Sequence, residues 1–596
     1  MSNYFTAVVR TDLVTRVEAW LRERGSSPSE EHVERIGPDT TLVVVSAGIS
    51  DCLAPGRFFR GTAMSPEHGA IAYGPRGWAA LPDEARRDPH GVAGTFVLVE
   101  WDAAQVVVRR DLTGSVGLAW TSGDGITAAS DSLLLLVDLR RWLGLPVTQN
   151  TEHLLARAFP NNKGAQQPCE ETFVQEVSYA AAGRGLRIPL DTLRGEQDGA
   201  RLTDRLLDAE VDEVATLRAA AAFVVRTMTA LVRAPHVDVR LSFSGGYDSR
   251  VLLGGALRGG VLAELPVAVV DRDAGHAPDV VAARGVADRY GLVLGDGTRR
   301  SKGDELRPDA LGTLASTTLG FYDTVFLEPV VQRGAVGLNG IGAGLLKGGW
   351  GWRSISELLP DAEKFVAERA ALRAQSAKGV RAAGGEPGWA DASELLYAAF
   401  RNGIHGAGVS IAVTMTTLRP LDQVALARLG HARVDGRSPR ERREAALLYG
   451  AQPSRMTGLL ALMDPELATL PYETPQKALS PGLVAERLAA AGGPLTPSEI
   501  DQPVALLGSP SDVPAGPSQL GLGAARHVGF HGPFQGPELL DLARRGAESV
   551  EDAQARLVYE GLLRKADQHV VRRGVEPRYA GPSLGKLLAL AMIAGP

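Results

Sequence analysis

Hydrophobic residues in the first 200 positions occur in short runs typical of β-strands. Val- and Leu-rich runs cover 41–45 and 94–102, and another at 105–109 follows the second after a gap too short for a helix. That spacing predicts a hairpin, and residues 126–130 predict a further strand. The pattern therefore favours a β-rich N-terminal region.

The pattern changes after residue 205, where longer apolar stretches alternate with short ones. A long Ala-, Val- and Leu-rich helix is expected over 209–233. The strands expected after it are 237–243, 266–270 and 335–338, with helices starting near Ser249 and covering 278–290. Strands that alternate with helices predict a parallel, doubly wound sheet.

The remainder of the chain has less regular patterning. Residues 360–460 look mainly helical, whereas 493–537 are rich in Gly, Pro and Ser and predict a long loop or linker. The last 60 residues look helical and include an apolar stretch over 584–593, which we expect to dock on the core.

These changes divide the chain into three predicted regions. Residues 1–204 form the β-rich region, 205–492 the region with the parallel sheet, and 493–596 a linker with C-terminal helices. The predicted fold class is α/β.

Composition narrows the classes of function. The 596 residues carry a net charge of −6 without a basic stripe, so we expect no nucleic-acid partner. The chain contains no stretch of about 18 apolar residues, so we expect no membrane span. The first residues do not resemble a signal peptide, which favours the cytoplasm. Cys52 and Cys169 are the only cysteines, which excludes a disulfide framework and a cysteine-rich zinc site.

The segment 241–250, Leu-Ser-Phe-Ser-Gly-Gly-Tyr-Asp-Ser-Arg, carries the strongest chemical signal. Gly245 and Gly246 let the backbone approach a ligand, and the N–H groups at a helix N-terminus can bind phosphate. Ser244 and Ser249 add hydroxyl donors. Asp248 would repel bare phosphate, so its carboxylate makes sense with Mg²⁺ between it and the phosphates. The spacing is neither that of a Gly-Lys-Ser/Thr nucleotide loop nor that of a dinucleotide fingerprint.

Ser-Gly-Gly-x-Asp-Ser after a strand resembles the pyrophosphate loop of ATP pyrophosphatases, and the chain as a whole resembles the class B asparagine synthetase family. The resemblance covers residues 90–480. The pieces that carry it, in order, are Gly94-x-Phe96, Trp101-Asp102, Arg110-Asp111-x-x-Gly114, Leu118, Trp120, Ala129-Ser130, Thr172-Phe173 to Gly183-Arg184-Gly185, and Leu418-Arg419-Pro420-Leu421-Asp422.

The resemblance implies an N-terminal sandwich domain of the N-terminal-nucleophile type, joined to an ATP pyrophosphatase domain that uses ATP and Mg²⁺. It implies pyrophosphate binding by Ser244, Gly245, Gly246 and Ser249, Mg²⁺ binding by Asp248, and contacts to adenosine by Phe243, Val270, Asn339 and Gly340. Lys347 and Lys477 are candidates to stabilise negative charge during acyl transfer. Arg250 could face phosphate or an adjacent acid.

Two departures from the family pattern bear on activity. Glutamine-dependent members need a cysteine after the initiator Met, and this chain has Ser2, so we expect an inactive glutaminase and an amine supplied by the substrate. Gly344 and Leu345 stand where the family carries Asp-Glu. Either another carboxylate replaces them, with Asp323 and Glu328 nearest in sequence, or the site is a binding relic.

The resemblance therefore implies ATP-dependent amide-bond formation through an adenylated carboxylate, with release of AMP and pyrophosphate. Among members without the cysteine, the lasso-peptide macrolactam cyclases fit best, which would make a precursor peptide the substrate and a leader peptidase and a leader-binding protein the partners. Two alternatives stay open. One is a ligase or β-lactam-type cyclase acting on a small acid, and the other is a non-catalytic nucleotide-binding scaffold subunit.

Overall fold

The structure is a computed structural model. It describes residues 3–161, 163–207, 210–269, 277–296, 310–323, 325–326, 334–408, 415–432, 454–514, 516–532, 536–573, 579–580 and 582–595.

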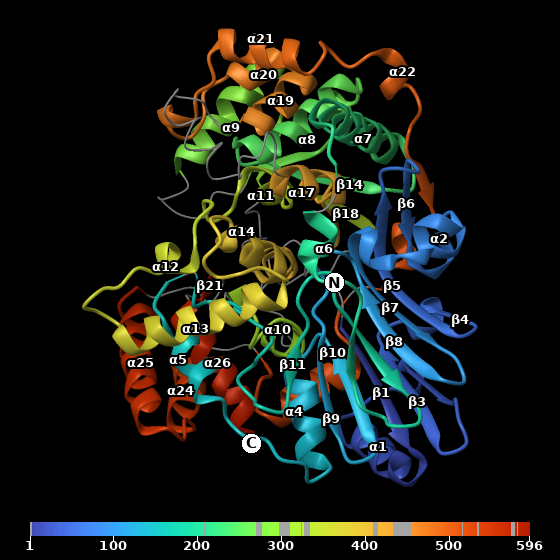
Figure 1. The fold of residues 1–596 in the computed structure, drawn as a ribbon, viewed down its shortest axis with the longest axis vertical. Coiled ribbons are helices and arrows are strands. Elements are labelled where there is room, and N and C mark those ends of the chain that lie inside the picture. Colours follow the sequence, from blue (N-terminus) through green and yellow to red (C-terminus); the bar gives the residue numbers. More distant parts are fainter. Residues whose placement is uncertain are drawn as a thin grey trace.

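Two largely antiparallel sheets stack face to face in the N-terminal part (Figure 1). The first has the order β11-β9-β10-β1-β3-β2 and the second β13-β12-β8-β7-β5-β6-β20. Their strands are β1 (Tyr4–Arg10), β2 (Glu31–Arg35), β3 (Thr40–Ser46), β5 (Arg57–Ser65), β6 (Ala70–Tyr73), β7 (Ala93–Trp101), β8 (Gln105–Arg110), β9 (Ala119–Gly123), β10 (Ile126–Ser130), β11 (Ser178–Tyr179), β12 (Gly185–Pro189), β13 (Glu196–Asp198) and β20 (Ala505–Leu507). The predicted β7–β8 hairpin is confirmed.

Strands in this sandwich are apolar along their whole length because both of their faces are covered. In β3, Leu42 and Val44 join the cluster between the sheets, whereas Val43 and Val45 face a second cluster shared with helices. Successive side chains of a strand point to opposite faces, so a run of apolar residues fills both layers. The prediction of a β-rich sandwich is confirmed.

A separate five-stranded sheet has the order β16-β15-β14-β18-β19, with all neighbouring strands parallel. Its strands are β14 (Asp238–Ser242), β15 (Val267–Val269), β16 (Leu294–Asp296), β18 (Ala335–Leu338) and β19 (Thr416–Leu418). From β14 the chain adds β15 and β16 on one side, and β18 and β19 follow on the other. The order therefore reverses between β14 and β18, which is where ligands bind in open α/β sheets.

The parallel sheet was predicted, but its two edge strands, β16 and β19, were not. β19 lies within the segment expected to be mainly helical. Three residues, Thr-Thr-Leu, are too few to show a period in the sequence. The strand is identified by its parallel pairing with β18, in which Leu338 lies opposite Leu418.

Helices α7 (Glu213–Arg233), α8 (Tyr247–Arg258) and α19 (Ser454–Met463) pack together beside the parallel sheet (Figure 1). Among the described residues, α7 alone is long and apolar enough to span a membrane by length and composition. However, 61% of its most apolar window is buried inside the protein. Its apolar residues join the cluster around β14, which identifies α7 as a core helix.

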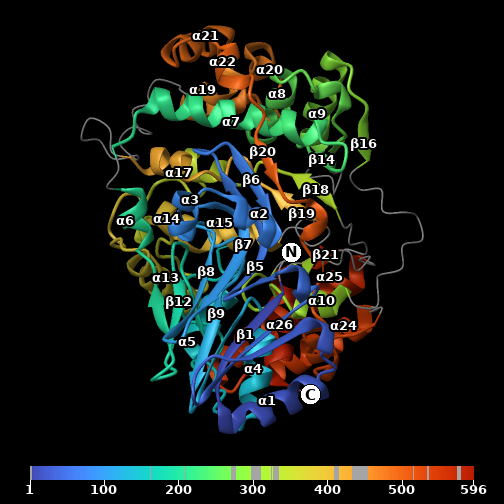
Figure 2. The same ribbon diagram turned by 90° about the vertical axis from the view of Figure 1, so that its right-hand side faces the viewer.

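The segment expected to be a long linker is largely ordered. It contains α22 (Pro497–Ile500), β20 and α23 (Gln519–His527). β20 extends the second sheet by pairing in parallel with β6, and the two lie side by side in Figure 2. The prediction of a loop fails here because three apolar residues between Gly- and Pro-rich stretches gain their structure only from a partner strand.

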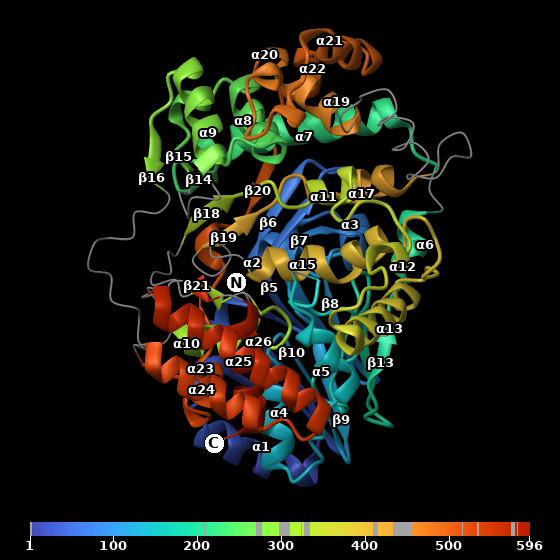
Figure 3. The ribbon, with the colours of Figure 1, turned by 90° about the vertical axis from the view of Figure 1, so that its left-hand side faces the viewer.

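The last helices pack against the N-terminal sandwich rather than standing apart (Figures 1 and 3). They are α24 (Gly536–Glu548), α25 (Ala553–Arg573) and α26 (Pro582–Ala594). Helix α26 contacts α4 (Leu133–Trp142) and α5 (Thr151–Ala158), α25 contacts α5, and α24 packs on α25 and α26. Leu587 and Leu588 of α26 have no exposed surface. The prediction that this apolar stretch docks on the core is confirmed.

Because α26 is buried between the sandwich and the other C-terminal helices, Leu588→Ala should lower the free energy of unfolding by about 2–5 kcal/mol. Chemical denaturation followed by circular dichroism measures the shift in the transition midpoint. Leu557→Ala on α25 is the matched control, because Leu557 is 67% exposed and its truncation should change little. Equal shifts for the two variants would contradict this packing.

Candidate functional site

The turn after β14 is tightly specified by its residues. Gly245 has φ +74°, and a Cβ atom there would lie 2.8 Å from the backbone nitrogen of Ala283 on α9 (Ala277–Tyr290). The Ser249 hydroxyl accepts from the Ser244 N–H at 3.3 Å and donates to the Gly246 carbonyl at 3.2 Å. The two serines thus hold the turn closed at the N-terminus of α8.

Arg250 supports this turn from behind. Its fully buried guanidinium donates to the Gly245 carbonyl at 2.8 Å and to the Leu470 carbonyl at 2.7 Å, and it lies 3.7 Å from the ring of Tyr472. These partners occupy the side chain within the protein. The negative charge of Glu473 also favours the charged guanidinium group, which agrees with the expectation that Arg250 could face an adjacent acid.

The turn after β18 meets the first one. A Cβ atom at Gly340 would lie 2.6 Å from the Cβ of Asp248, so only glycine allows this approach. Gly342 has φ +107°, and a Cβ there would lie 2.5 Å from the Asp422 backbone nitrogen. The Asn339 side chain accepts from the Ile341 N–H at 3.1 Å.

A cavity of about 530 Å³ lies at these two turns, at the point where the strand order reverses. Its lining includes seven of the residues predicted from the sequence, namely Phe243, Ser244, Asp248, Ser249, Asn339, Gly340 and Lys347. Gly245 and Gly246 belong to the same turn, and Val270 lies outside the described residues.

Asp248 and Lys347 form an ion pair in the cavity. The ammonium group, at the end of α11 (Ala343–Lys347), donates to Oδ1 at 2.5 Å and to Oδ2 at 2.7 Å. The two side chains are 27% (Lys347) and 34% (Asp248) exposed. Lys477 differs, because its ammonium pairs with Glu473 and its carbonyl accepts from the hydroxyl of Tyr247. Lys477 is not among the residues that line the cavity.

Tyr397 occupies the space beside Gly344 where a side chain would lie. A Cβ atom on Gly344 would lie 2.7 Å from the phenol oxygen of Tyr397, and one on Gly349 would lie 2.4 Å from its ring. The aromatic ring thus fills the space that an aspartate would need. Burial raises the pKa of Tyr397 to about 12, so the phenol stays protonated near neutral pH.

The local helix geometry positions Tyr397. It begins one turn of π-helix, Tyr397–Arg401, directly after α14 (Ala392–Leu396). On α14, the fully buried Glu394 carboxylate accepts the N–H groups of Gly349 and Trp350, both at 2.6 Å. Such π turns occur often at functional sites. The sequence gives no periodic signal for one, so Tyr397 could not be singled out.

His405 also lines the cavity and was not predicted. It lies on α15 (Asn402–Gly408), and its Nδ1 is 2.9 Å from the hydroxyl of Tyr322. The sequence alone does not single out His405, because its partner Tyr322 is far away in the chain and only the fold brings the two together.

Asp323, one of the two replacement carboxylates suggested by the sequence, does not line the cavity. Asp323 is fully buried and pairs with Arg157 at 2.5 Å, and it is not among the lining residues. The expectation for Asp323 is therefore wrong, and Glu328 lies outside the described residues. The second carboxylate that lines the cavity is Asp279, at the start of α9.

The described residues contain no group of three or more His, Cys, Asp or Glu side chains able to hold a metal ion by themselves. Mg²⁺ usually binds through one or two carboxylates together with waters and substrate phosphates. Asp248 at the cavity wall is a single carboxylate of the kind that such a site uses.

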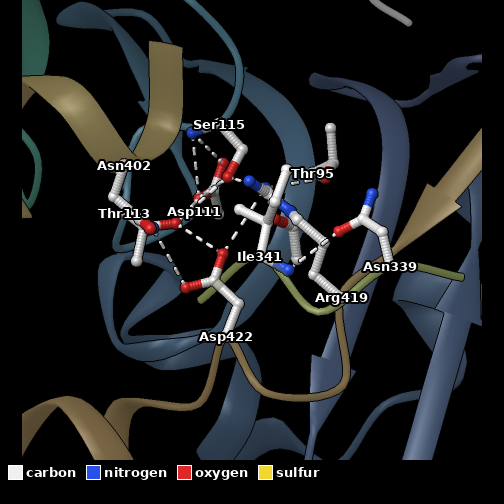
Figure 4. Close-up of polar contacts among 10 residues, drawn as sticks. Thr95, Asp111, Thr113, Ser115, Asn339, Ile341, Asn402, Arg419 and Asp422 are labelled. Carbon is white, nitrogen blue, oxygen red and sulfur yellow. Dashed lines mark hydrogen bonds and ion pairs between the residues drawn. The ribbon is translucent and has the colours of Figure 1, made fainter. Parts of the chain in front are cut away.

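A buried polar junction joins the sandwich to the parallel-sheet region behind the cavity (Figure 4). Arg419 donates to the Gly94 carbonyl and the Thr95 hydroxyl, both at 3.1 Å. The Thr113 hydroxyl lies 2.9 Å from Oδ2 of Asp422. These residues come from motifs that carried the family resemblance, so those motifs meet at the junction between the two regions.

Two carboxylates of the junction share one hydroxyl group. The Thr113 hydroxyl lies 2.9 Å from an oxygen of both Asp111 and Asp422, and it has one proton to donate. Burial raises the pKa of Asp422 to about 6, with Arg419 opposing and Asp111 reinforcing the shift.

The start of β1 is covered by the chain itself. The buried Arg60 guanidinium donates to the carbonyls of Asn3 and Gly516, both at 2.9 Å. The Asn3 side chain accepts from the Ser518 N–H at 3.0 Å and from its hydroxyl at 2.7 Å. Ser2 lies outside the described residues.

No family model and no curated protein matches the chain. Among solved structures, an allosteric regulatory enzyme of purine biosynthesis matches with 10% identity and a TM-score of 0.20, covering 56% of this chain and 74% of its own. Glutamine phosphoribosylpyrophosphate amidotransferase from B. subtilis matches with 10% identity and a TM-score of 0.19, covering 57% and 77%. At such TM-scores neither match supports a conclusion about fold or function.

The pKa of Asp422 predicts a pH-dependent stability. A carboxyl whose folded pKa is raised from 3.8 to about 6 stabilises the fold below pH 4, and that contribution is lost as the pH rises through 6. The loss is on the order of 2–3 kcal/mol. The difference between the melting temperatures at about pH 4 and about pH 7 should be smaller in Asp422→Asn than in wild type. Parallel pH profiles of the two proteins would contradict the raised pKa of Asp422.

Proposed function

We propose that the protein activates a carboxylate with ATP and joins it to an amine, releasing AMP and pyrophosphate. The observation that carries the proposal is the position of the Ser-Gly-Gly-x-Asp-Ser turn. It lies at the C-terminal end of β14, at the reversal of strand order, and shares its cavity with Lys347 and His405. The proposal also rests on the resemblance to the class B asparagine synthetase family.

Each part of the turn has a role in holding the polyphosphate. The N-terminus of α8 lies at the cavity, and its backbone N–H groups favour an anion there. Ser244 supplies a hydroxyl, and Gly340 keeps the opposite wall free of a side chain. Phe243 and Asn339 line the same cavity, where they can contact the nucleoside. A bound Mg²⁺, held by Asp248, would neutralise the pyrophosphate as it leaves.

Two side chains suit the second step. A carboxylate oxygen of the substrate attacks the α-phosphorus and pyrophosphate leaves. The amine then attacks the activated acyl carbon and AMP leaves. His405 lines the cavity beside Tyr322 and is the candidate to take the proton released by the amine. Lys347 lies close enough to the turn to stabilise negative charge on the phosphate or the acyl oxygen.

The amine most consistent with the fold belongs to the substrate itself. The start of β1, where an N-terminal nucleophile would act, is covered by Arg60, Asn3 and residues 516–518. We therefore propose an inactive glutaminase-like region and ring closure within a ribosomal peptide, with a leader peptidase and a leader-binding protein as partners.

A non-catalytic nucleotide-binding subunit is the second candidate. Two observations favour it. Lys347 already pairs with Asp248, and Tyr397 fills the space that an acidic side chain at position 344 would need. Incubation with Mg·ATP and a pool of peptides, each with a free N-terminal amine and an internal Asp or Glu, separates the two. Amide formation appears as AMP and as a peptide that has lost one water. AMP formation with no peptide in the pool would support neither candidate.

Asp248→Ala should abolish the Mg²⁺-dependent binding of ATP, because it removes the carboxylate that would hold the metal beside the phosphates. Isothermal titration calorimetry measures this without knowledge of the acid substrate. Asp541→Ala is the matched control, because Asp541 pairs with Arg544 on the exposed face of α24, far from the cavity. Unchanged binding in Asp248→Ala would remove the central role of this turn.

His405→Ala should separate the two chemical steps. Adenylation should persist, seen as peptide-dependent exchange of pyrophosphate into ATP, whereas amide formation should fall by about 10²–10⁴-fold. Tyr322→Phe should give a smaller loss, since it removes only the group that orients the ring. Amide formation at the wild-type rate in His405→Ala would exclude this histidine as the base.

A further inference from the structure

The ion pair between Lys347 and Asp248 has a consequence for metal binding. One ammonium group donates to both oxygens of the carboxylate, at 2.5 Å and 2.7 Å. Mg²⁺ would need to approach an oxygen of this carboxylate to 2.0–2.1 Å, distances that are typical of about six-coordinate magnesium sites. The ammonium group repels a divalent cation that approaches this carboxylate and takes one lone pair on each oxygen, so the metal and Lys347 compete for Asp248.

The described lining of the cavity holds one further carboxylate, that of Asp279, and the described residues contain no group of three or more His, Cys, Asp or Glu side chains able to hold a metal ion. Tyr397 fills the space where a side chain at Gly344 would reach the cavity. A cation arriving alone would have to compete with the ammonium group of Lys347 for Asp248. A cation arriving with a polyphosphate brings a new anion for that group.

We propose that Lys347 is a built-in counter-ion that keeps divalent cations off Asp248 until a nucleotide polyphosphate enters the cavity. The ammonium group then transfers from the carboxylate to a phosphate oxygen. Lysine suits this exchange, because it is a compact charge on a flexible stem with three donors. Binding of the metal and of the nucleotide is thereby coupled. The inference rests on the proposed nucleotide site.

The test uses Mn²⁺ alone as the probe, with the full chain and no nucleotide, and counts free Mn²⁺ by electron paramagnetic resonance. Wild type should bind Mn²⁺ weakly. Lys347→Met should bind it more tightly by roughly tenfold or more, the scale expected for one partly buried ion pair. The gain should vanish in the double variant Asp248→Asn/Lys347→Met, and Lys347→Arg should behave as wild type because a guanidinium group still pairs with the carboxylate.

Lys378→Met is the matched control. Lys378 also pairs with carboxylates, those of Glu152 and Glu171, but it lies outside the cavity. Its removal should not create a site that depends on Asp248. Circular dichroism confirms that each variant is folded, and Lys347→Gln repeats the test with a polar side chain.

A non-hydrolysable ATP analogue completes the test. It should raise the affinity of wild type for Mn²⁺ strongly and that of Lys347→Met less, since the coupling is reciprocal. Equal Mn²⁺ affinity in wild type and Lys347→Met without nucleotide would overturn the inference, even if the nucleotide still binds. Failure of the analogue to bind either protein would instead contradict the proposed function.

Discussion

The arrangement of the cavity depends on one buried junction, in which Arg419 and Asp422 connect the parallel sheet to the sandwich. Arg419 reaches the Gly94 carbonyl, and Asp422 shares the Thr113 hydroxyl with Asp111. The backbone of Asp422 also lies so close to Gly342 that no side chain fits there. The junction therefore fixes the turn after β18. That turn in turn bounds the cavity, because Gly340 lies against Asp248.

Through this junction the N-terminal sandwich has a structural role at the cavity. Its strands supply Gly94, Thr95, Asp111 and Thr113 to the junction, and its covered start of β1 is sealed by residues 516–518. The C-terminal helices pack on the same sandwich. A buried charged network is costly to break because a lone partner keeps its desolvation cost. Such a junction is suited to hold two regions in one orientation.

The sequence allowed the prediction of much of the fold because its strands are either apolar runs or part of a strand–helix alternation. Among the strands that it did not predict are β16, β19 and β20, which have three residues each and exist only through a partner strand. At the cavity, Asp248 was found from the 241–250 motif, and Lys347 from the glycine-rich segment that includes Gly340 and Gly344. Tyr397, His405 and Asp279 were missed, because they reach the cavity from separate helices and only tertiary packing brings them there.

The most direct test of the central claim is the crystal structure of the protein with Mg²⁺ and a non-hydrolysable ATP analogue. The polyphosphate should lie against the Ser244–Ser249 turn and the metal should bind Asp248. The Lys347 ammonium group should have moved from the carboxylate to a phosphate oxygen. A nucleotide bound elsewhere, or one bound while the Lys347–Asp248 pair stays closed, would contradict the account.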